Sequence, residues 1–271
     1  MIRKIIVLLL LFAAPAFANQ TPNRIVSVAP GFTEILYALG VGKQIVGTTE
    51  YCDYPPEAKL TEKIGDVVNP NIEKIISLHP DIVFAGKWKW KVPETLRNMG
   101  INVVEIPDAQ TVSDIFDRIS LIGKNVGKEK EAERIVSKMK SDLDSIRKEG
   151  QQEVKKPVYM ELDTGNWTIG GTSYFDEVLN YAGGQNIFHD RQEPYLMVTI
   201  ESIVARNPIV FLSLFRKKED IVNLPAFNAL AAVKHGNILD KSCMNWDTIT
   251  RQSPRLIEGV KTLRQLIQAV H

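Results

Sequence analysis

The sequence predicts an α/β fold of two Rossmann-like lobes with mostly parallel sheets, joined by a single long backbone helix. Three observations predict it. Strand-like apolar runs alternate with helical patterns in the first and last parts of the chain. A charged, proline-free helical stretch separates those two parts, and a similar helix-strand unit occurs on each side of it. Alternation of strands and helices is typical of a parallel sheet covered by helices.

The first 18 residues have the features of a secretion signal. Arg3 and Lys4 precede an apolar run at 5–12, and Ala16-Phe17-Ala18 matches a small-x-small cleavage pattern, so we expect cleavage before Asn19. The apolar run is too short to cross about 30 Å of hydrocarbon, which takes about 20 residues. No cysteine follows the expected cleavage site to accept a lipid. We therefore expect a soluble protein of the periplasm.

Charge and composition limit the partners of the mature chain. Loss of the first 18 residues removes two of the 33 basic residues and none of the 32 acidic ones, which leaves a formal net charge of −1. Such a balance gives no reason to expect nucleic acid or an anionic membrane as a partner. We expect a monomer that binds a small molecule. The four histidines lack the spacing of zinc ligands, so neither a metal nor a cofactor is predicted.

The two cysteines, Cys52 and Cys243, lie far apart in the sequence. In an oxidising compartment the pair could form a disulfide that closes a long loop. Two free thiols fit the sequence equally well, because the spacing does not reveal whether the two side chains meet.

We assign residues 19–110 to an N-terminal lobe. Arg24 to Ala29 is an apolar run typical of a buried strand, and a helix with apolar residues at helical spacing follows it. Pro80 ends the next helix and leads into another buried strand. In order, we expect strands at 24–29, 43–48, 81–85 and 102–106, and helices at 32–39, 71–78 and 92–99.

The connecting segment comprises residues 111–150 and is predicted to be helical. Within it, residues 129–148 carry apolar side chains at three-to-four spacing, which is the pattern of an amphipathic helix. About 20 residues of helix are about 30 Å long, which is enough to bridge two small lobes.

We assign residues 151–271 to a C-terminal lobe, in which a second set of strands and helices follows. We expect strands at 158–162, 209–214 and 237–239, and helices at 174–182, 200–205 and 253–270. Residues 72–84 and 200–211 share Ile, Glu, Ile and Pro in register, and each segment leads from a helix into a buried strand. The repeat indicates two lobes of matching construction.

Several of these segments resemble a known family. Residues 24–34, residues 51–55 and the segment from Glu73 through Val83 are similar to the helical-backbone substrate-binding proteins of ABC importers, the class III group, which bind cobalamin, haem or ferric siderophores. The stretch Tyr-Cys-Asp-Tyr-Pro-Pro and the start of the last helix at Ser253 resemble its vitamin B12-binding members. The resemblance implies a non-enzymatic transport protein that holds its ligand between the lobes, with little hinge motion.

The resemblance also implies a partner, the permease dimer of the inner membrane. In the family a surface glutamate from each lobe pairs with permease arginines, and Glu73 and Glu201 occupy the matching positions. The positions of these two glutamates also have a local explanation, because a carboxylate in the first turn of a helix interacts favourably with the helix dipole and can complete a capping box.

A cobalamin cleft needs aromatic faces for a flat macrocycle and polar groups for its amides. Tryptophans and tyrosines follow the ends of predicted strands, which is where open α/β sheets bind ligands. Each tryptophan could instead pack in a core. Arg251, before the last helix, is a candidate to hydrogen-bond ligand amides or to form an exposed ion pair. The predicted ligand-binding residues are Pro30, Phe32, Tyr51, Trp88, Trp90, Trp167, Tyr195, Trp246 and Arg251.

Other ligands and one other class of function remain open at this point. Haem would use an axial tyrosine, histidine or methionine that faces the cleft, and Tyr51 or Tyr195 could serve. Ferric siderophores favour several cleft arginines, whereas Arg251 is the one that the sequence places there. An exported enzyme would need catalytic residues, but the chain has no Gly-x-Ser-x-Gly, no His-Glu-x-x-His and no phosphate-binding glycine loop, so none is predicted.

Overall fold

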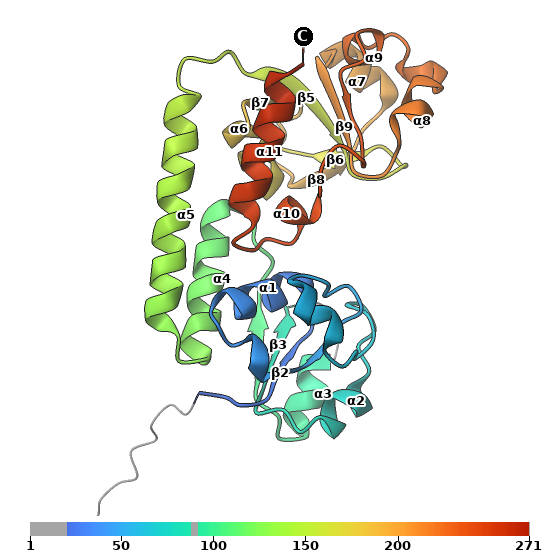
Figure 1. Cartoon of the computed structure of the whole chain (residues 1–271). Helices are drawn as coiled ribbons and strands as arrows, with labels where there is room; N and C mark the ends of the chain where they lie inside the picture. Colours follow the sequence, from blue (N-terminus) through green and yellow to red (C-terminus); the bar gives the residue numbers. More distant parts are fainter. Residues whose placement is uncertain (1–20, 88–91, 271) are drawn as a thin grey trace, which may run out of the picture.

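The computed structural model describes residues 21–87 and 92–270 of the chain. These residues form two α/β lobes that are bridged on one side by two helices, α4 (Val112–Asn125) and α5 (Glu129–Glu149) (Figure 1). The predicted fold class is confirmed. None of the helices in the described ranges combines the length and the apolar character needed to cross a membrane.

The N-terminal lobe contains a four-stranded parallel sheet of strand order β2-β1-β3-β4. Apolar side chains fill β1 and β3 and are buried on both faces, as expected for the central strands of a parallel sheet. The strands are β1 (Ile25–Ser27), β2 (Ile45–Thr48), β3 (Ile82–Gly86) and β4 (Val103–Ile106), and the helices are α1 (Pro30–Ala38), α2 (Ile72–Ser77) and α3 (Val92–Asn98).

The C-terminal lobe repeats this arrangement. Its parallel sheet has the order β7-β5-β9-β10, so in both lobes the first strand lies between the second and third, and the fourth pairs with the third. The strands are β5 (Lys156–Glu161), β7 (Gly184–Asn186), β9 (Val210–Ser213) and β10 (Ile238–Leu239); the helices are α6 (Tyr174–Tyr181), α7 (Ile200–Arg206), α8 (Lys218–Val222), α9 (Ala231–Lys234), α10 (Asp247–Thr250) and α11 (Leu256–Gln268).

A two-stranded antiparallel sheet, which the sequence did not predict, lies at the edge of the C-terminal lobe that faces the N-terminal lobe (Figure 1). It pairs β6 (Trp167–Ile169) with β8 (Tyr195–Met197). The last helix also differs from the prediction, since it begins at Leu256 rather than at Ser253. The residues before it take part in contacts between the lobes.

Helix α5 supports the bridge through one buried stripe. Ala132, Val136, Met139, Leu143 and Ile146 are buried at three-to-four spacing, while the opposite face is charged and exposed. The stripe packs against α4 near one lobe and against α6 and α11 of the other. At its C-terminal end the chain continues into an exposed loop, residues 151–155, before it enters β5.

The lobes are also joined by what we term the interlobe cluster: Glu34, Asp53, Arg251, Ser253 and Arg255. Glu34 of α1 is 4% exposed and accepts hydrogen bonds from Arg251 at 3.1 Å, from Arg255 at 3.2 Å and from the Ser253 hydroxyl. Arg251 also donates to Asp53 at 2.6 Å. These contacts tie α1 to the start of α11 across the boundary between the lobes.

Backbone contacts bring the same segments even closer. A Cβ atom built on Gly31 would lie 2.0 Å from the carbonyl oxygen of Arg251, so only glycine allows this approach. The side-chain amide of Gln252 exchanges two hydrogen bonds with the backbone of Ala109, at 3.2 and 3.1 Å. The lobes therefore meet through well-defined polar contacts as well as through α5.

Candidate functional site

A cavity of about 370 Å³ lies between the lobes. Its N-terminal wall comes from the loops that follow β1, β2 and β4, where the carboxyl ends of parallel strands meet. That edge of an open α/β sheet is the usual position of a ligand site. The lining residues are Ala29, Pro30, Gly31, Phe32, Tyr51, Val67, Asp108, Arg118, Asp247, Thr250, Arg251 and Gln252.

Four of the predicted residues line this cavity: Pro30, Phe32, Tyr51 and Arg251. Pro30 begins α1 at a position where its missing N–H costs nothing. Phe32 is 3% exposed and packs against the Arg118 guanidinium, whose carbon lies 5.3 Å from the centroid of the Phe32 ring. Tyr51 is 58% exposed, so its ring is available to a ligand.

The two-stranded sheet of β6 and β8 presents apolar side chains on the facing lobe. Trp167 pairs with Met197 across this sheet, and Tyr195 lies two residues before Met197 on the same face of β8. Their exposed fractions are 42%, 68% and 41%, respectively. Phe215, just beyond β9, is 53% exposed as well. So many exposed large apolar groups at one edge are typical of a binding surface.

Trp246, another predicted ligand-binding residue, does not add to this surface. Trp246 is partly buried, packs against the main core and donates its indole N–H to the carbonyl oxygen of Asp240 at 3.2 Å. It does not line the interlobe cavity. Trp88 and Trp90 lie outside the described residues.

Arg251 lines the cavity, but its guanidinium is largely engaged. Its side chain is 10% exposed and forms ion pairs with Glu34, Asp53 and Asp247 at 3.1, 2.6 and 2.7 Å. Burial alone would lower the pKa of Arg251, yet the hydrogen bond with Asp53 and the surrounding carboxylates raise it above its usual value. The arrangement makes Arg251 an anchor between the lobes.

Arg118 and Asp108 are cavity residues that the sequence reasoning missed. Arg118 lies on α4 and is 6% exposed. Burial lowers the pKa of its guanidinium, and Asp108 acts in the opposite direction. A signal was present in the sequence, because Arg118 falls in the apolar stripe formed by Ile115, Ile119 and Ile122, where a charged side chain needs an explanation.

Glu73 and Glu201 lie in equivalent places in the two lobes. Each is exposed at the second position of a helix, α2 or α7, that precedes the third strand of its sheet. Asn71 and Thr199 cap these helices, accepting from Lys74 and Ser202 at 2.9 and 3.2 Å. The capping box is therefore not the role of either glutamate, and neither carboxylate forms an ion pair or hydrogen bond with another residue of the described ranges.

Cys52 and Cys243 are free thiols in this structure, so the disulfide alternative is not realised here. Cys52 is buried in the N-terminal lobe, where its sulfur accepts a hydrogen bond from the Thr33 hydroxyl at 3.1 Å. Cys243 is exposed on the other lobe, and its sulfur accepts from the backbone N–H of Asp240 at 3.2 Å.

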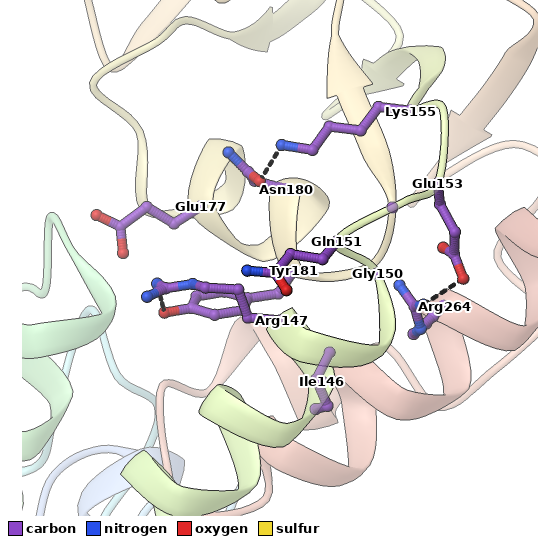
Figure 2. A pocket seen from close by; sticks show the side chains of 11 residues that line it. Ile146, Arg147, Gly150, Gln151, Glu153, Lys155, Glu177, Asn180, Tyr181 and Arg264 are labelled. Carbon is purple, nitrogen blue, oxygen red and sulfur yellow. Dashed lines mark hydrogen bonds and ion pairs between the residues drawn. The ribbon is translucent and has the colours of Figure 1, made fainter.

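Two larger hollows lie away from the carboxyl ends of the strands. One of about 1020 Å³ adjoins the end of α1 and the start of β2. The other, about 550 Å³, lies between the end of α5, α6 and α11 (Figure 2). There Arg147 donates to the Tyr181 hydroxyl at 2.8 Å, Arg264 pairs with Glu153 at 2.6 Å, and Lys155 donates to the Asn180 side chain. The polar groups of this second hollow bind each other, and neither hollow lies at the strand ends where open α/β sheets bind ligands, so the 370 Å³ cavity is the better candidate.

The family is identified by comparison with known proteins. The family model described as periplasmic binding protein matches residues 25–241. An uncharacterized ABC transporter substrate-binding lipoprotein of Bacillus subtilis, YvrC, is 37% identical over 259 residues, or 92% of this chain and 81% of the relative. The vitamin B12-binding protein of Vibrio cholerae is 30% identical over 270 residues, 93% of this chain and 92% of the relative.

Solved structures give the same result. The periplasmic vitamin B12 binding protein BtuF of Vibrio cholerae superimposes with a TM-score of 0.76 at 26% identity, over 92% of this chain and 98% of that one. A periplasmic solute-binding protein of Staphylococcus epidermidis, described as a possible iron-binding protein, has a TM-score of 0.81 and 32% identity, over 92% and 99% of the two chains. The resemblance found in the sequence is confirmed: the chain belongs to the periplasmic binding protein family.

Proposed function

We propose that this protein captures cobalamin or a related corrinoid between its two lobes and delivers it to the permease of an ABC importer. The observation that carries the proposal is the set of exposed aromatic side chains on both sides of the gap. Tyr51 belongs to the N-terminal lobe, and Trp167, Tyr195 and Phe215 belong to the C-terminal lobe. Such residues suit the faces of a large planar macrocycle.

Two further observations support a corrinoid. The similarity to vitamin B12-binding proteins extends over nearly the whole chain, in sequence and in structure. The cavity also offers both a guanidinium and carboxylates, from Arg118, Asp108 and Asp247, which suits a ligand whose rim carries many uncharged amides.

Calorimetry with the mature chain, residues 19–271, tests this proposal. Cyanocobalamin should bind one-to-one, and Trp167→Ala should weaken binding about tenfold or more, as expected for a central aromatic contact. Val154→Ala is a matched control, since Val154 is 91% exposed in the loop after α5. Absence of cyanocobalamin binding to the wild-type protein refutes the proposal.

An iron chelate, haem or a ferric siderophore, is the second candidate. The similarity to the Staphylococcus epidermidis protein favours it, and the exposed Tyr51 could supply an axial phenolate oxygen to haem. Titrations with haemin and with a ferric siderophore separate the candidates. A tighter interaction with haemin than with cyanocobalamin, lost in Tyr51→Phe, would favour the haem alternative.

The same proposal includes docking to the permease through Glu73 and Glu201. Their matched positions and free carboxylates suit ion pairs with arginines on a partner. Glu73→Ala combined with Glu201→Ala should leave ligand affinity unchanged and abolish uptake in reconstituted transporter vesicles. Glu129→Ala, on the first turn of α5, is the control. An equal loss of ligand affinity and uptake in the double variant contradicts a docking role.

Export to the periplasm through a cleavable signal peptide completes the proposal. The Bacillus subtilis relative is named a lipoprotein, whereas position 19 of this chain is asparagine and offers no thiol for a lipid. Mass spectrometry of the exported protein should give a mature N-terminus at Asn19. An intact residue 1 on the protein recovered outside the cytoplasm contradicts it.

A further inference from the structure

Arg118 carries unused hydrogen-bonding capacity at the floor of the interlobe cavity. Its side chain is buried, with 6% of the residue exposed, and it lines the cavity. An arginine has five N–H donors. In the described part of the chain only one nitrogen, Nη2, donates a hydrogen bond, to the carbonyl oxygen of Pro107 at 2.8 Å, and the buried Nε has no partner. A buried donor without a partner needs an explanation.

Packing accounts for part of this burial but not for the free donors. The guanidinium lies over the ring of Phe32, with its carbon 5.3 Å from the ring centroid. A cation above an aromatic face is stabilised, yet the N–H groups that radiate in the guanidinium plane still require acceptors. Nε is too buried for a ligand to reach, so a ligand acceptor would approach the terminal nitrogens of Arg118 where its side chain lines the cavity.

Asp108 provides the opposite chemistry in the same cavity. It is exposed and lies near enough to Arg118 to influence it electrostatically, but the two do not form an ion pair within the described ranges. Asp108 and Arg118 both line the cavity, so one ligand can reach both groups. The cavity thus presents a donor and an acceptor that do not satisfy each other.

We propose that Arg118 and Asp108 together recognise a primary carboxamide of the ligand, with the amide oxygen accepting from Arg118 and the amide nitrogen donating to Asp108. This inference rests on the proposed function, because corrinoids carry several such amides. It specifies how the cleft selects them. A carboxylate in the same place has no hydrogen to donate to Asp108 and is repelled by it. The pair therefore selects amide-bearing corrinoids over macrocycles that carry carboxylates.

The monocarboxylic acids of cyanocobalamin test the selection directly. Each of the three isomers replaces one propionamide by a carboxylate and leaves the rest of the molecule unchanged. At neutral pH, at least one isomer should bind the wild-type protein about tenfold or more weakly than cyanocobalamin, in line with one lost hydrogen bond to a charged group.

The variant Asp108→Asn identifies the group responsible. It removes the repelling charge from an exposed residue, so folding should be unaffected. The preference for amide over acid should shrink to about twofold or less, because the remaining Arg118 now favours the acid. Arg118→Gln should instead weaken the binding of cyanocobalamin and, more strongly, that of the acids, with far-UV dichroism checking its fold. Asp142→Asn, at an exposed ion pair on α5, is the control and should keep the wild-type preference.

The outcomes separate this inference from the proposed function. Tight cyanocobalamin binding with equal affinity for all three acids overturns the amide site and leaves the corrinoid function intact. A preference for the amide that persists unchanged in Asp108→Asn also overturns it. Failure of the wild-type protein to bind cyanocobalamin at all refutes both the amide site and the proposed corrinoid function.

Discussion

The interlobe cluster predicts a large stability effect for a single isosteric change, Glu34→Gln. The Glu34 side chain is 2% exposed and accepts hydrogen bonds from Arg251, Arg255 and Ser253. Glutamine keeps the shape but removes the negative charge; its oxygen can still accept from the two arginines, with its NH₂ group towards the Ser253 hydroxyl. The variant thus leaves buried positive charge without its main compensation.

The magnitude follows from what remains in place. Removing one partner of a buried ion pair costs about 3 to 5 kcal/mol. Arg251 keeps Asp53 and Asp247, whereas the one carboxylate left to Arg255 within the described residues is that of Glu258, at 3.6 Å. We therefore expect the lower end, about 3 kcal/mol. For a chain of this size that corresponds to a fall in melting temperature of about 6 to 12 °C.

Thermal unfolding followed by circular dichroism measures this change. Glu131→Gln is the matched control, because Glu131 forms an exposed ion pair with Arg134 on α5 and should melt like the wild type. Combining Glu34→Gln with Arg255→Gln should cost less than the sum of the two single changes, since the two residues interact. A Glu34→Gln protein that melts together with Glu131→Gln refutes the assigned role of the cluster.

Three further predictions follow from the same contacts. Partial burial would raise the pKa of Asp53, but the hydrogen bond and charge of Arg251 hold that pKa below 3.8. The stabilisation from the Asp53 carboxylate is therefore present above pH 3.8 and is lost as the pH falls through the folded-state pKa. Urea unfolding of wild type and Asp53→Asn should differ at about pH 6 and converge at about pH 2, and a constant difference contradicts this. Gly31→Ala places a Cβ 2.0 Å from the Arg251 carbonyl oxygen and should lower the melting temperature more than Gly165→Ala, whose nearest contact is 3.3 Å; equal effects contradict the close approach. Because α5 and the interlobe cluster both restrain the lobes, small-angle scattering should show little change on ligand addition, and a clear domain closure contradicts it.

Much of the fold could be predicted because long apolar patterns specify it. The strands at 24–29 and 81–85, the helix at 129–148 and the repeat around Glu73 and Glu201 all have counterparts in the structure. The antiparallel pair of β6 and β8 was missed, since strands of three residues are too short to show periodicity. The helices α8, α9 and α10, of four or five residues, were missed for the same reason.

The site was harder to predict because its contacts are remote in sequence. Glu34 and Arg251 are 217 residues apart, and no local pattern reveals that they meet. Tyr51 and Trp167 were predicted to face the gap between the lobes because each follows a strand. The same rule could not distinguish them from Trp246, whose indole N–H donates a hydrogen bond within its own lobe. Arg118 was predictable in principle, as a charged residue on an otherwise apolar helical stripe.

The exposed loop at 151–155 has a consequence for how the protein tolerates proteolysis. The main chain passes from one lobe to the other only once, yet α11 returns to pack on α5 and its preceding residues bind α1. A tryptic cut after Lys155 would sever the backbone and leave those surfaces untouched. The two fragments should elute as one particle and retain binding, since the continuity of the peptide is not what keeps the halves together.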